Sequence, residues 1–271
     1  MSTFLLLKNV HERDQYISFE ESTHTYTVHG ESNYTSVTTW NHSHFEKFEE
    51  EKIIASILRN PKHKKDVNYK YYGKTAEEIH AEWEANRICA STAGTKMHLD
   101  IEYYYNGDFD KILGGDSIEF SFFHNFVADF ERDFPYMRPY RTEWTVFFEE
   151  LRIAGSIDMI FENVNDGGSL WVYDWKRCKE ITYESSFGNK TAKTPCLSDL
   201  PDTNFWHYSL QLNMYKMILE TKYGKRVTKM CLVCLHPDNY NHNYQLHEVN
   251  PMSPERIEEL CSYRKEELLL K

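Results

Sequence analysis

Long apolar runs are missing from this sequence of 271 residues. No stretch approaches the roughly 18–20 apolar residues that a membrane-spanning helix needs, so we expect no membrane partner. The first apolar run, at residues 4–7, is too short for the core of a secretory signal. Glu12 and Asp14 follow it closely, and acidic residues so early disfavour a mitochondrial presequence. We therefore expect an intracellular protein, in the nucleus, the cytoplasm or a mitochondrion.

Positive charge is also scarce. The chain has 31 lysines and arginines against 42 aspartates and glutamates, which gives a formal net charge of −11. A general basic coat for nucleic acid is thereby excluded, and any grip on phosphates must be local. Cysteine is sparse too: the six cysteines show no regular spacing, which predicts reduced thiols rather than a disulfide framework. No Walker lysine motif is present, so we expect no helicase module in this chain.

The hydrophobic pattern predicts one α+β (mixed α/β) domain spanning residues 1–271. The hydrophobic period changes from about 3.6 to about 2 residues after residue 132, which indicates helices first and strands afterwards. We expect a hairpin at 16–29 and a helix at 44–59, followed by two successive helices or one bent helix with Gly94 between the halves and Asn106-Gly107 at the end. A helix at 117–132 precedes strands at 142–148, 151–161 and 169–176 and a loop at 185–204. A helix at 205–222 capped by Asn204, strands at 227–235 and 243–249, and a last helix that begins at Ser253-Pro254 complete the order. This order is typical of a central mixed sheet flanked by helices. Residues 1–75 would form an N-terminal hairpin with a helical and basic extension, 76–250 the core, and 251–271 a C-terminal helix.

A charged pair ends the most apolar strand of the predicted sheet. Asp174 and Lys176 follow the apolar residues 170–173 and share one face, because side chains two apart on a strand point the same way. The turn sequence NDGG at 165–168 predicts a hairpin in which opposite residue numbers sum to 332, so Asp158 would face Asp174 at about 5 Å. Two carboxylates so close repel each other unless a cation lies between them, and oxygen ligands suit Mg²⁺ or Mn²⁺. Lys176 would then orient an attacking water and help to deprotonate it; the alternative is a surface hairpin with a simple ion pair.

Two further pairs of polar residues occupy helical i,i+4 positions. His98 and Glu102 share one face of a predicted helix, and Gln211 and Tyr215 share one face of another. Each pair taken alone is also compatible with an ordinary structural role.

Taken in order, four short motifs resemble those of the PD-(D/E)XK nuclease superfamily, and specifically its RecB-like branch. They are Gly94-Thr95-x-x-His98 with Ile101-Glu102, Gly155-Ser156-Ile157-Asp158, Asp174-Trp175-Lys176 and Gln211-x-x-x-Tyr215. The stretches His24-x-Tyr26-x-Val28-x-Gly30 and Ser36-Val37-Thr38 resemble the matching region of the mitochondrial genome maintenance exonuclease and its viral relatives. The resemblance extends over residues 20–250 and implies a restriction-endonuclease-like core with N-terminal additions.

The resemblance also implies an activity, which is metal-dependent hydrolysis of DNA that leaves 5′-phosphate and 3′-hydroxyl ends. It implies that Mg²⁺ or Mn²⁺ is held by His98, Asp158, Asp174 and the main-chain carbonyl of Trp175, with Lys176 as the catalytic lysine. Glu143 would join these catalytic residues by supporting the site, Glu102 would be a supporting residue, and Gln211 and Tyr215 would steady the site or touch the DNA backbone. The acid in the D-x-K triplet is Asp174 where many relatives carry Glu, a change that the family tolerates. The expected function is an exonuclease for single-stranded or end-containing DNA in replication, repair or recombination. An endonuclease or RNase with the same site, or a non-catalytic nucleic-acid-binding protein on this fold, is the alternative.

A segment rich in lysine and tyrosine, residues 61–74, is a candidate for local contact with DNA. Its five lysines stand against one aspartate, so basic side chains could track phosphates while tyrosines stack on unpaired bases. The candidate DNA-binding residues here are Lys62, Lys64, Lys65, Tyr69 and Lys70; the alternative is a solvated loop. Arg87 and Ser91, one helical turn apart, resemble the pair with which related exonucleases hold a terminal phosphate.

Some RecB-like nucleases carry an iron–sulfur cluster on four cysteines, three of which lie close together near the C-terminus. The cysteines of this chain do not give that trio: they are Cys89, Cys178, Cys196, Cys231, Cys234 and Cys261. We therefore expect no iron–sulfur cluster.

Overall fold

The computed structural model describes residues 3–185, 188 and 190–270. The chain divides into two compact units, Met1–Glu46 with Met97–Lys271 and Lys47–Lys96, and each is described here by itself. The sequence-based boundaries at residues 75 and 250 do not coincide with these units, and the behaviour of the chain as one domain stays a prediction.

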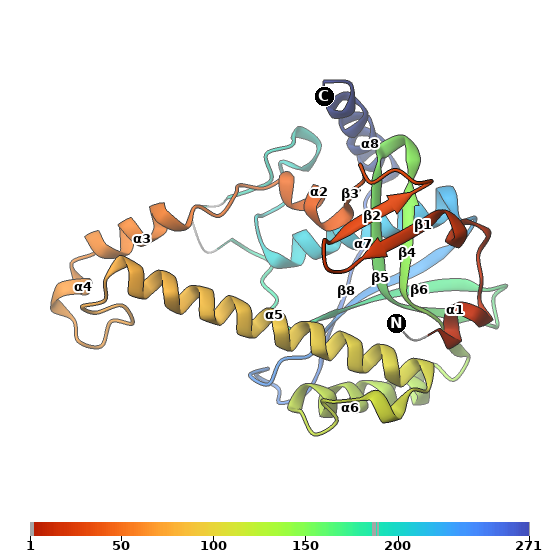
Figure 1. Ribbon diagram of the computed structural model, residues 1–271, viewed down its shortest axis with the longest axis horizontal. Coiled ribbons are helices and arrows are strands. Elements are labelled where there is room, and N and C mark those ends of the chain that lie inside the picture. Colours follow the sequence, from red (N-terminus) through yellow and green to blue (C-terminus); the bar gives the residue numbers. More distant parts are fainter. Residues whose placement is uncertain (1–2, 186–187, 189, 271) are drawn as a thin grey trace. The chain divides into compact units, whose positions relative to one another are not determined.

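Within the described residues, the larger unit contains the predicted mixed sheet flanked by helices, and this sheet has six strands, of which β3 was not predicted (Figure 1). The strands are β3 (Thr35–Ser36), β4 (Met137–Phe148), β5 (Ile153–Asn163), β6 (Ser169–Lys176), β7 (Val227–Cys234) and β8 (Gln245–Glu248). Along one edge of β5 runs β4, in antiparallel pairing. The other edge pairs with β3 in parallel near the start of β5 and with antiparallel β6 near its end, which leaves residues 155–158 between those two neighbours. Next to β6 come parallel β7 and then antiparallel β8.

Helices cover both faces of this sheet. Helix α6 (Ile118–Asp133) and the last turns of α5 (Ala76–Asn106) pack on one face, while α2 (Val37–Ser43) and α7 (Asn204–Lys222) pack on the other (Figure 1). The side chains of β6 alternate between the two: Trp171, Tyr173 and Trp175 join the α6 side, whereas Leu170 and Val172 join the α7 side. Because strand side chains alternate, Asp174 and Lys176 emerge on the α7 side.

Several local expectations are confirmed. Strands β1 (Ile17–Glu20) and β2 (Thr25–Val28) form the predicted N-terminal hairpin. Helix α8 (Pro254–Leu269) begins at Ser253-Pro254, where the Ser253 hydroxyl accepts a hydrogen bond from the main-chain N–H of Arg256. Helix α5 ends at Asn106, and Gly107 follows with a φ of +79°, which glycine adopts without strain.

Two expectations about helices are wrong in detail, and a third is decided between its two alternatives. Gly94 lies inside α5, which is one helix and not two successive ones, because a single glycine costs a long helix only about 1 kcal/mol. Asn204 is the first residue of α7 and not its cap; its side-chain oxygen instead accepts a hydrogen bond from Thr182 N at 2.8 Å. Helix α3 covers Glu50–Arg59, shorter than 44–59, and Phe45 is buried in the core on the α7 side.

The smaller unit contains α3, α4 (Lys62–Lys65) and the first turns of α5. Its chain is held together locally: Trp83 Nε1 donates a hydrogen bond to Tyr71 Oη at 3.0 Å, and Glu82 forms ion pairs with Lys70 and Lys74. The larger unit also has the short helix α1 (Phe4–Lys8) and 3₁₀ helices at Glu12–Tyr16, Phe109–Lys111, Glu149–Leu151 and Pro195–Leu197. No helix in the described ranges combines the length and apolar character needed to cross a membrane.

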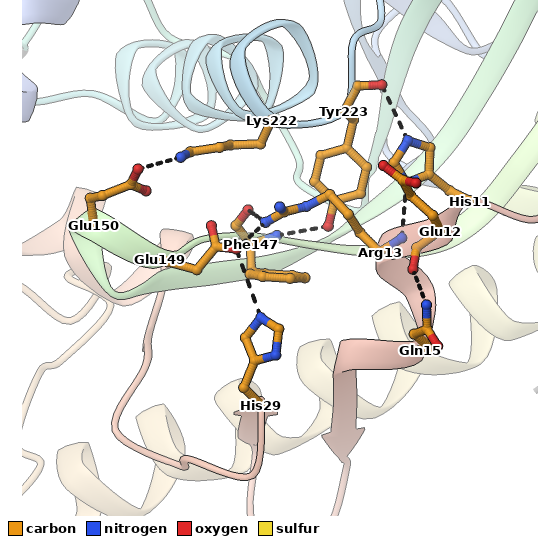
Figure 2. Close-up of polar contacts among 10 residues, drawn as sticks. All are labelled: His11, Glu12, Arg13, Gln15, His29, Phe147, Glu149, Glu150, Lys222 and Tyr223. Carbon is orange, nitrogen blue, oxygen red and sulfur yellow. Dashed lines mark hydrogen bonds and ion pairs between the residues drawn. The ribbon is translucent and has the colours of Figure 1, made fainter.

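The first 3₁₀ helix is anchored to the sheet through Arg13 (Figure 2). The Arg13 guanidinium lies 4.0 Å above the Phe147 ring and donates a hydrogen bond to Glu149 Oε1 at 2.8 Å. His11 reaches the main-chain oxygen of Tyr223 at the end of α7, 3.2 Å away (Figure 2). A cation packed on an aromatic face and paired with a carboxylate contributes stability, so these contacts fix the N-terminal segment to β4 and α7.

A buried arginine makes a second long-range connection. Arg264 of α8 donates hydrogen bonds to the Leu151 carbonyl at 3.0 Å and to the Thr35 hydroxyl at 2.8 Å, and it pairs with Glu267. It therefore joins the C-terminal helix to the start of β5 and to β3.

Candidate active site

Three carboxylates lie side by side on three adjacent strands. The pairs from Met159↔Tyr173 to Asn163↔Ser169 confirm the predicted hairpin register, and Asp158 and Asp174 come next in that register. On the other edge of β5, the pairs Thr142↔Met159 and Trp144↔Ile157 place Glu143 opposite Asp158. The central aspartate thus has an acidic residue on each neighbouring strand, at the point where β6 parts from β5.

A histidine from α5 meets two of these carboxylates. His98 Nδ1 lies 3.5 Å from Asp158 Oδ2 and 3.9 Å from Glu143 Oε1. Among the described residues, one ligand atom from each of His98, Glu143 and Asp158 lies within 4.8 Å of the others. One nitrogen and two carboxylate oxygens at this spacing are a donor set that suits a divalent cation.

Asp174 lies outside this group of three. Asp174 is 1% exposed; Lys176 Nζ forms an ion pair with its Oδ2 at 2.5 Å, and Gln211 Nε2 donates a hydrogen bond to its Oδ1 at 3.3 Å. The structure therefore groups Glu143, which the resemblance included among the catalytic residues but not among the metal ligands, with His98 and Asp158. A direct metal contact of Asp174 stays a prediction.

Glu143 adopts an unusual backbone conformation. Its φ is +43°, a left-handed value that costs a residue with a side chain about 1–3 kcal/mol and is often found at functional sites. Its carboxylate is held by the Ser156 hydroxyl, which donates to Oε2 at 2.8 Å. The conformation and the hydrogen bond together direct the side chain toward His98.

The pKa values reflect this concentration of acids. Burial disfavours the charged imidazole of His98, but the Asp158 and Glu143 carboxylates outweigh burial and raise its pKa to about 9. Burial and the charge of Asp174 raise the pKa of Asp158 to about 7, although His98 acts in the opposite direction. A protonated imidazole therefore balances part of the negative charge where a cation would bind.

Lys176 is held between a carboxylate and an aromatic ring. Its ammonium lies beside Asp174 and 4.4 Å from the centre of the Tyr208 ring. Burial alone would lower the pKa of Lys176, but the charges of Asp174 and Asp158 raise it above the ordinary lysine value. Sequence reasoning missed Tyr208; the available signal was its place three residues before Gln211 on the same helix.

Gln211 and Tyr215 reach the site as predicted. Gln211 contacts Asp174, and its Nε2 also lies 3.4 Å from the Tyr215 hydroxyl. The Tyr215 ring lies over Gly155, since a Cβ added to Gly155 would be 2.7 Å from Tyr215 Cε1. Glycine at this position makes room for the tyrosine.

Other predicted residues have more modest positions. The main-chain N–H of Trp175 donates to Asp158 Oδ2 at 2.9 Å, while metal binding by its carbonyl stays a prediction. Glu102 is buried on α5, one turn after His98, and does not belong to the group of three donors. Tyr26 of β2 was quoted only as part of a motif, but burial and then the charges of Glu143 and Asp158 raise its pKa, which places it beside the site.

The candidate DNA-binding residues belong to the smaller unit. Lys62, Lys64 and Lys65 lie exposed on or at the ends of α4, Tyr69 and Lys70 follow in the next turns, and Ser91 is exposed on α5. Arg87 is paired with Glu84 of its own helix, with Nη2 and Oε2 2.6 Å apart. Contact of these residues with DNA stays a prediction.

Comparison with known proteins leaves the family open. No family model matches the sequence. No curated protein matches it either. Among solved structures, one titled "Crystal structure of SSO0001" is similar over 65% of this chain and 74% of that chain, at 17% sequence identity and a TM-score of 0.28. A match at this level supports no conclusion about the fold or function of the chain.

Proposed function

We propose that this chain is a metal-dependent nuclease that hydrolyses DNA phosphodiester bonds, acting as an exonuclease on single-stranded or end-containing DNA. The observation that carries the proposal is the cluster of His98, Glu143 and Asp158 beside the Asp174–Lys176 pair, on the strand and helix positions of the four nuclease-like motifs. A surface hairpin with a simple ion pair would not bury Asp174 or bring a helical histidine to Asp158.

The residues present fit a small divalent cation. His98, Glu143 and Asp158 would hold it, and their nitrogen and oxygen donors suit Mg²⁺ or Mn²⁺. When bound, such a cation supplies Lewis acidity and positive charge at a phosphoryl oxygen. The carboxylates of Glu143 and Asp158 also provide negative charge that attracts a cation to the site.

The remaining residues position the substrate and its protons. With its pKa raised, Lys176 keeps its proton, so it would donate a hydrogen bond to a phosphate oxygen or an attacking water instead of serving as the resting base. Asp174 and the Tyr208 ring hold its amino group in place. Gln211 holds Asp174 from α7, so the position of Lys176 depends on both the sheet and the helix.

Cleavage of end-labelled linear single strands in Mg²⁺, compared with the same reaction in a chelator, tests the proposal. Asp158→Asn, Asp174→Asn and Lys176→Met should each lower the rate by at least about 10²-fold, because each removes a charge from the reacting centre. Lys179→Met is the matched control: this exposed lysine pairs with Asp238 and should keep the wild-type rate. Cleavage at the wild-type rate by all three site variants would overturn the proposal.

Circular single-stranded DNA then separates the modes of cleavage. Resistance of the circle alongside digestion of the linear strand supports an exonuclease, whereas cutting of the circle assigns an endonuclease. Binding of DNA without cleavage in Mg²⁺ or Mn²⁺ would assign a non-catalytic binding protein.

A further inference from the structure

Two histidines form a second polar cluster on the larger unit. His42 at the end of α2 and His207 in the first turns of α7 have ring centres 5.3 Å apart. His207 is fixed in place: Asp202 Oδ1 lies 2.8 Å from its Nε2, and its ring stacks on Phe45 at 3.9 Å. His42 is exposed. The cluster therefore combines one oriented imidazole with one that is open to solvent.

Helix α7 connects this cluster to the candidate active site. His207, Gln211 and Tyr215 follow one another at intervals of four residues, so they lie along one face of the helix. Gln211 touches Asp174, Tyr215 lies over Gly155, and Tyr208, the neighbour of His207, lies against Lys176. His207 extends this row by one turn, to the place where α2 packs against α7.

The charge of Lys176 also reaches the cluster. Burial, then His207 and then Lys176 lower the pKa of His42 from its ordinary value, while Asp202 opposes them. This agrees with the packing of α2 and α7 and places His42 on the side of the site where Lys176 lies.

We propose that His42 and His207 form a phosphate-binding subsite next to Lys176, which holds a phosphate of the nucleic-acid strand adjacent to the one that is cleaved. This inference rests on the proposed nuclease function. Asp202 Oδ1 lies against Nε2 of His207, so Nδ1 is the ring nitrogen that would donate to a phosphate oxygen when the imidazole carries both protons. His42 supplies the second donor from the facing helix.

The N-terminus of α7 supports the same assignment. Thr203 is its cap residue, but its side chain makes no capping hydrogen bond, and its buried hydroxyl has no hydrogen-bond partner among the described residues. The positive end of a helix and its free main-chain N–H groups favour a bound anion. Because the chain has a net charge of −11, it can bind phosphate only where hydrogen-bond donors and positive charge are concentrated locally, as they would be here.

Binding measurements test the subsite without any need for turnover. His42→Gln and His207→Gln keep side-chain hydrogen-bonding groups but cannot take up a proton, and His124→Gln, an exposed position on α6, is the matched control. Because the pKa of His42 is lowered, binding of a fluorescein-labelled single-stranded oligonucleotide is followed at pH 5.5 in chelator. Each subsite variant should weaken binding about 3–10-fold and reduce the slope of log Kd against log salt by about 0.7. In Mg²⁺, KM should rise while kcat stays within about twofold of wild type.

Oligonucleotides with and without a 5′-phosphate identify the phosphate. A loss confined to the 5′-phosphorylated strand assigns the subsite to a terminal phosphate, and an equal loss on both strands assigns it to an internal phosphodiester. Wild-type binding and KM in both variants would overturn the subsite while leaving the nuclease function intact.

Inorganic phosphate gives a readout that does not depend on DNA. The imidazole NMR signals of His42 and His207 should shift on addition of phosphate, and those of His124 should not. If the wild type neither binds nor cleaves DNA, the proposed nuclease function fails, and this titration alone decides the anion site: unshifted signals would overturn it.

Discussion

Glu143 lies opposite Asp158 on the neighbouring strand, and it does so with a left-handed backbone. The pairing brings two carboxylates to one histidine, and the strained φ of +43° turns the Glu143 side chain toward them. A strained residue in the middle of a strand persists only where the surrounding structure fixes it.

Replacement of Glu143 by Gln should weaken binding of Mn²⁺ by at least about tenfold, because one of the three donors loses its charge. The amide can still accept the Ser156 hydrogen bond, so the fold should be retained. Isothermal titration calorimetry measures the affinity, and Glu162→Gln on β5 is the control that should bind Mn²⁺ as wild type does. Equal affinities in both variants would remove Glu143 from the metal site.

Affinity for Mn²⁺ should rise with pH. A metal ligand must be deprotonated, whereas the metal-free protein holds a proton on His98 up to about pH 9 and partly on Asp158 near pH 7. Displacement of the His98 proton predicts a Kd that falls by about tenfold per pH unit between pH 7 and 9. Calorimetry in buffers of different ionisation enthalpy should show the released proton. A Kd that does not change over this range would contradict the assignment of His98 as a ligand.

Gly155→Ala should destabilise the protein by about 1–3 kcal/mol, because the new methyl group would lie 2.7 Å from the Tyr215 ring. Gly94→Ala is the control: in the described part of the chain nothing lies within 4 Å of its added Cβ, and alanine favours a helix by up to about 1 kcal/mol. Urea unfolding compares the two variants. Equal stability for both would mean that Tyr215 does not pack on Gly155.

The burial of His44 leads us to expect a lower free energy of unfolding in mild acid. His44 is buried beside Thr194, with Nδ1 2.8 Å from the Thr194 hydroxyl, and burial lowers its pKa to about 4. Below pH 6.5 the unfolded chain takes up a proton that the folded protein excludes, so the free energy of unfolding should fall by about 3 kcal/mol between pH 6.5 and 4. Urea unfolding at several pH values should show this slope in the exposed-site control His24→Asn but not in His44→Asn. The same slope in both variants would contradict the account.

The part of the site that the sequence predicts best is the part with local signals. The NDGG turn determines the register of β5 and β6, and alternation then puts Asp158, Asp174 and Lys176 in their places. Helical spacing likewise predicts that Gln211 and Tyr215 reach one site from one face. Both predictions use only residues that are close together in the sequence.

The role of Glu143 depends on information that a single sequence does not carry. Strand β4 has an irregularity between Pro139 and Arg141 and a left-handed residue in its centre, so simple alternation does not indicate where Glu143 points. Asn204 resembled a helix cap, but its side chain bonds to Thr182 in the preceding loop. In both places a tertiary contact outweighs the local pattern.

Arg264 makes the geometry around Gly155 depend on a distant part of the chain. Its guanidinium donates hydrogen bonds to the Leu151 carbonyl and the Thr35 hydroxyl, which lie beside the beginning of β5. Removal of this arginine by truncation would leave both acceptors without their donor. The beginning of β5, the strand that carries Asp158, would then be held less firmly. Truncations that remove Arg264 are therefore expected to alter the proposed activity through the sheet, even when every residue near the candidate metal ligands is unchanged.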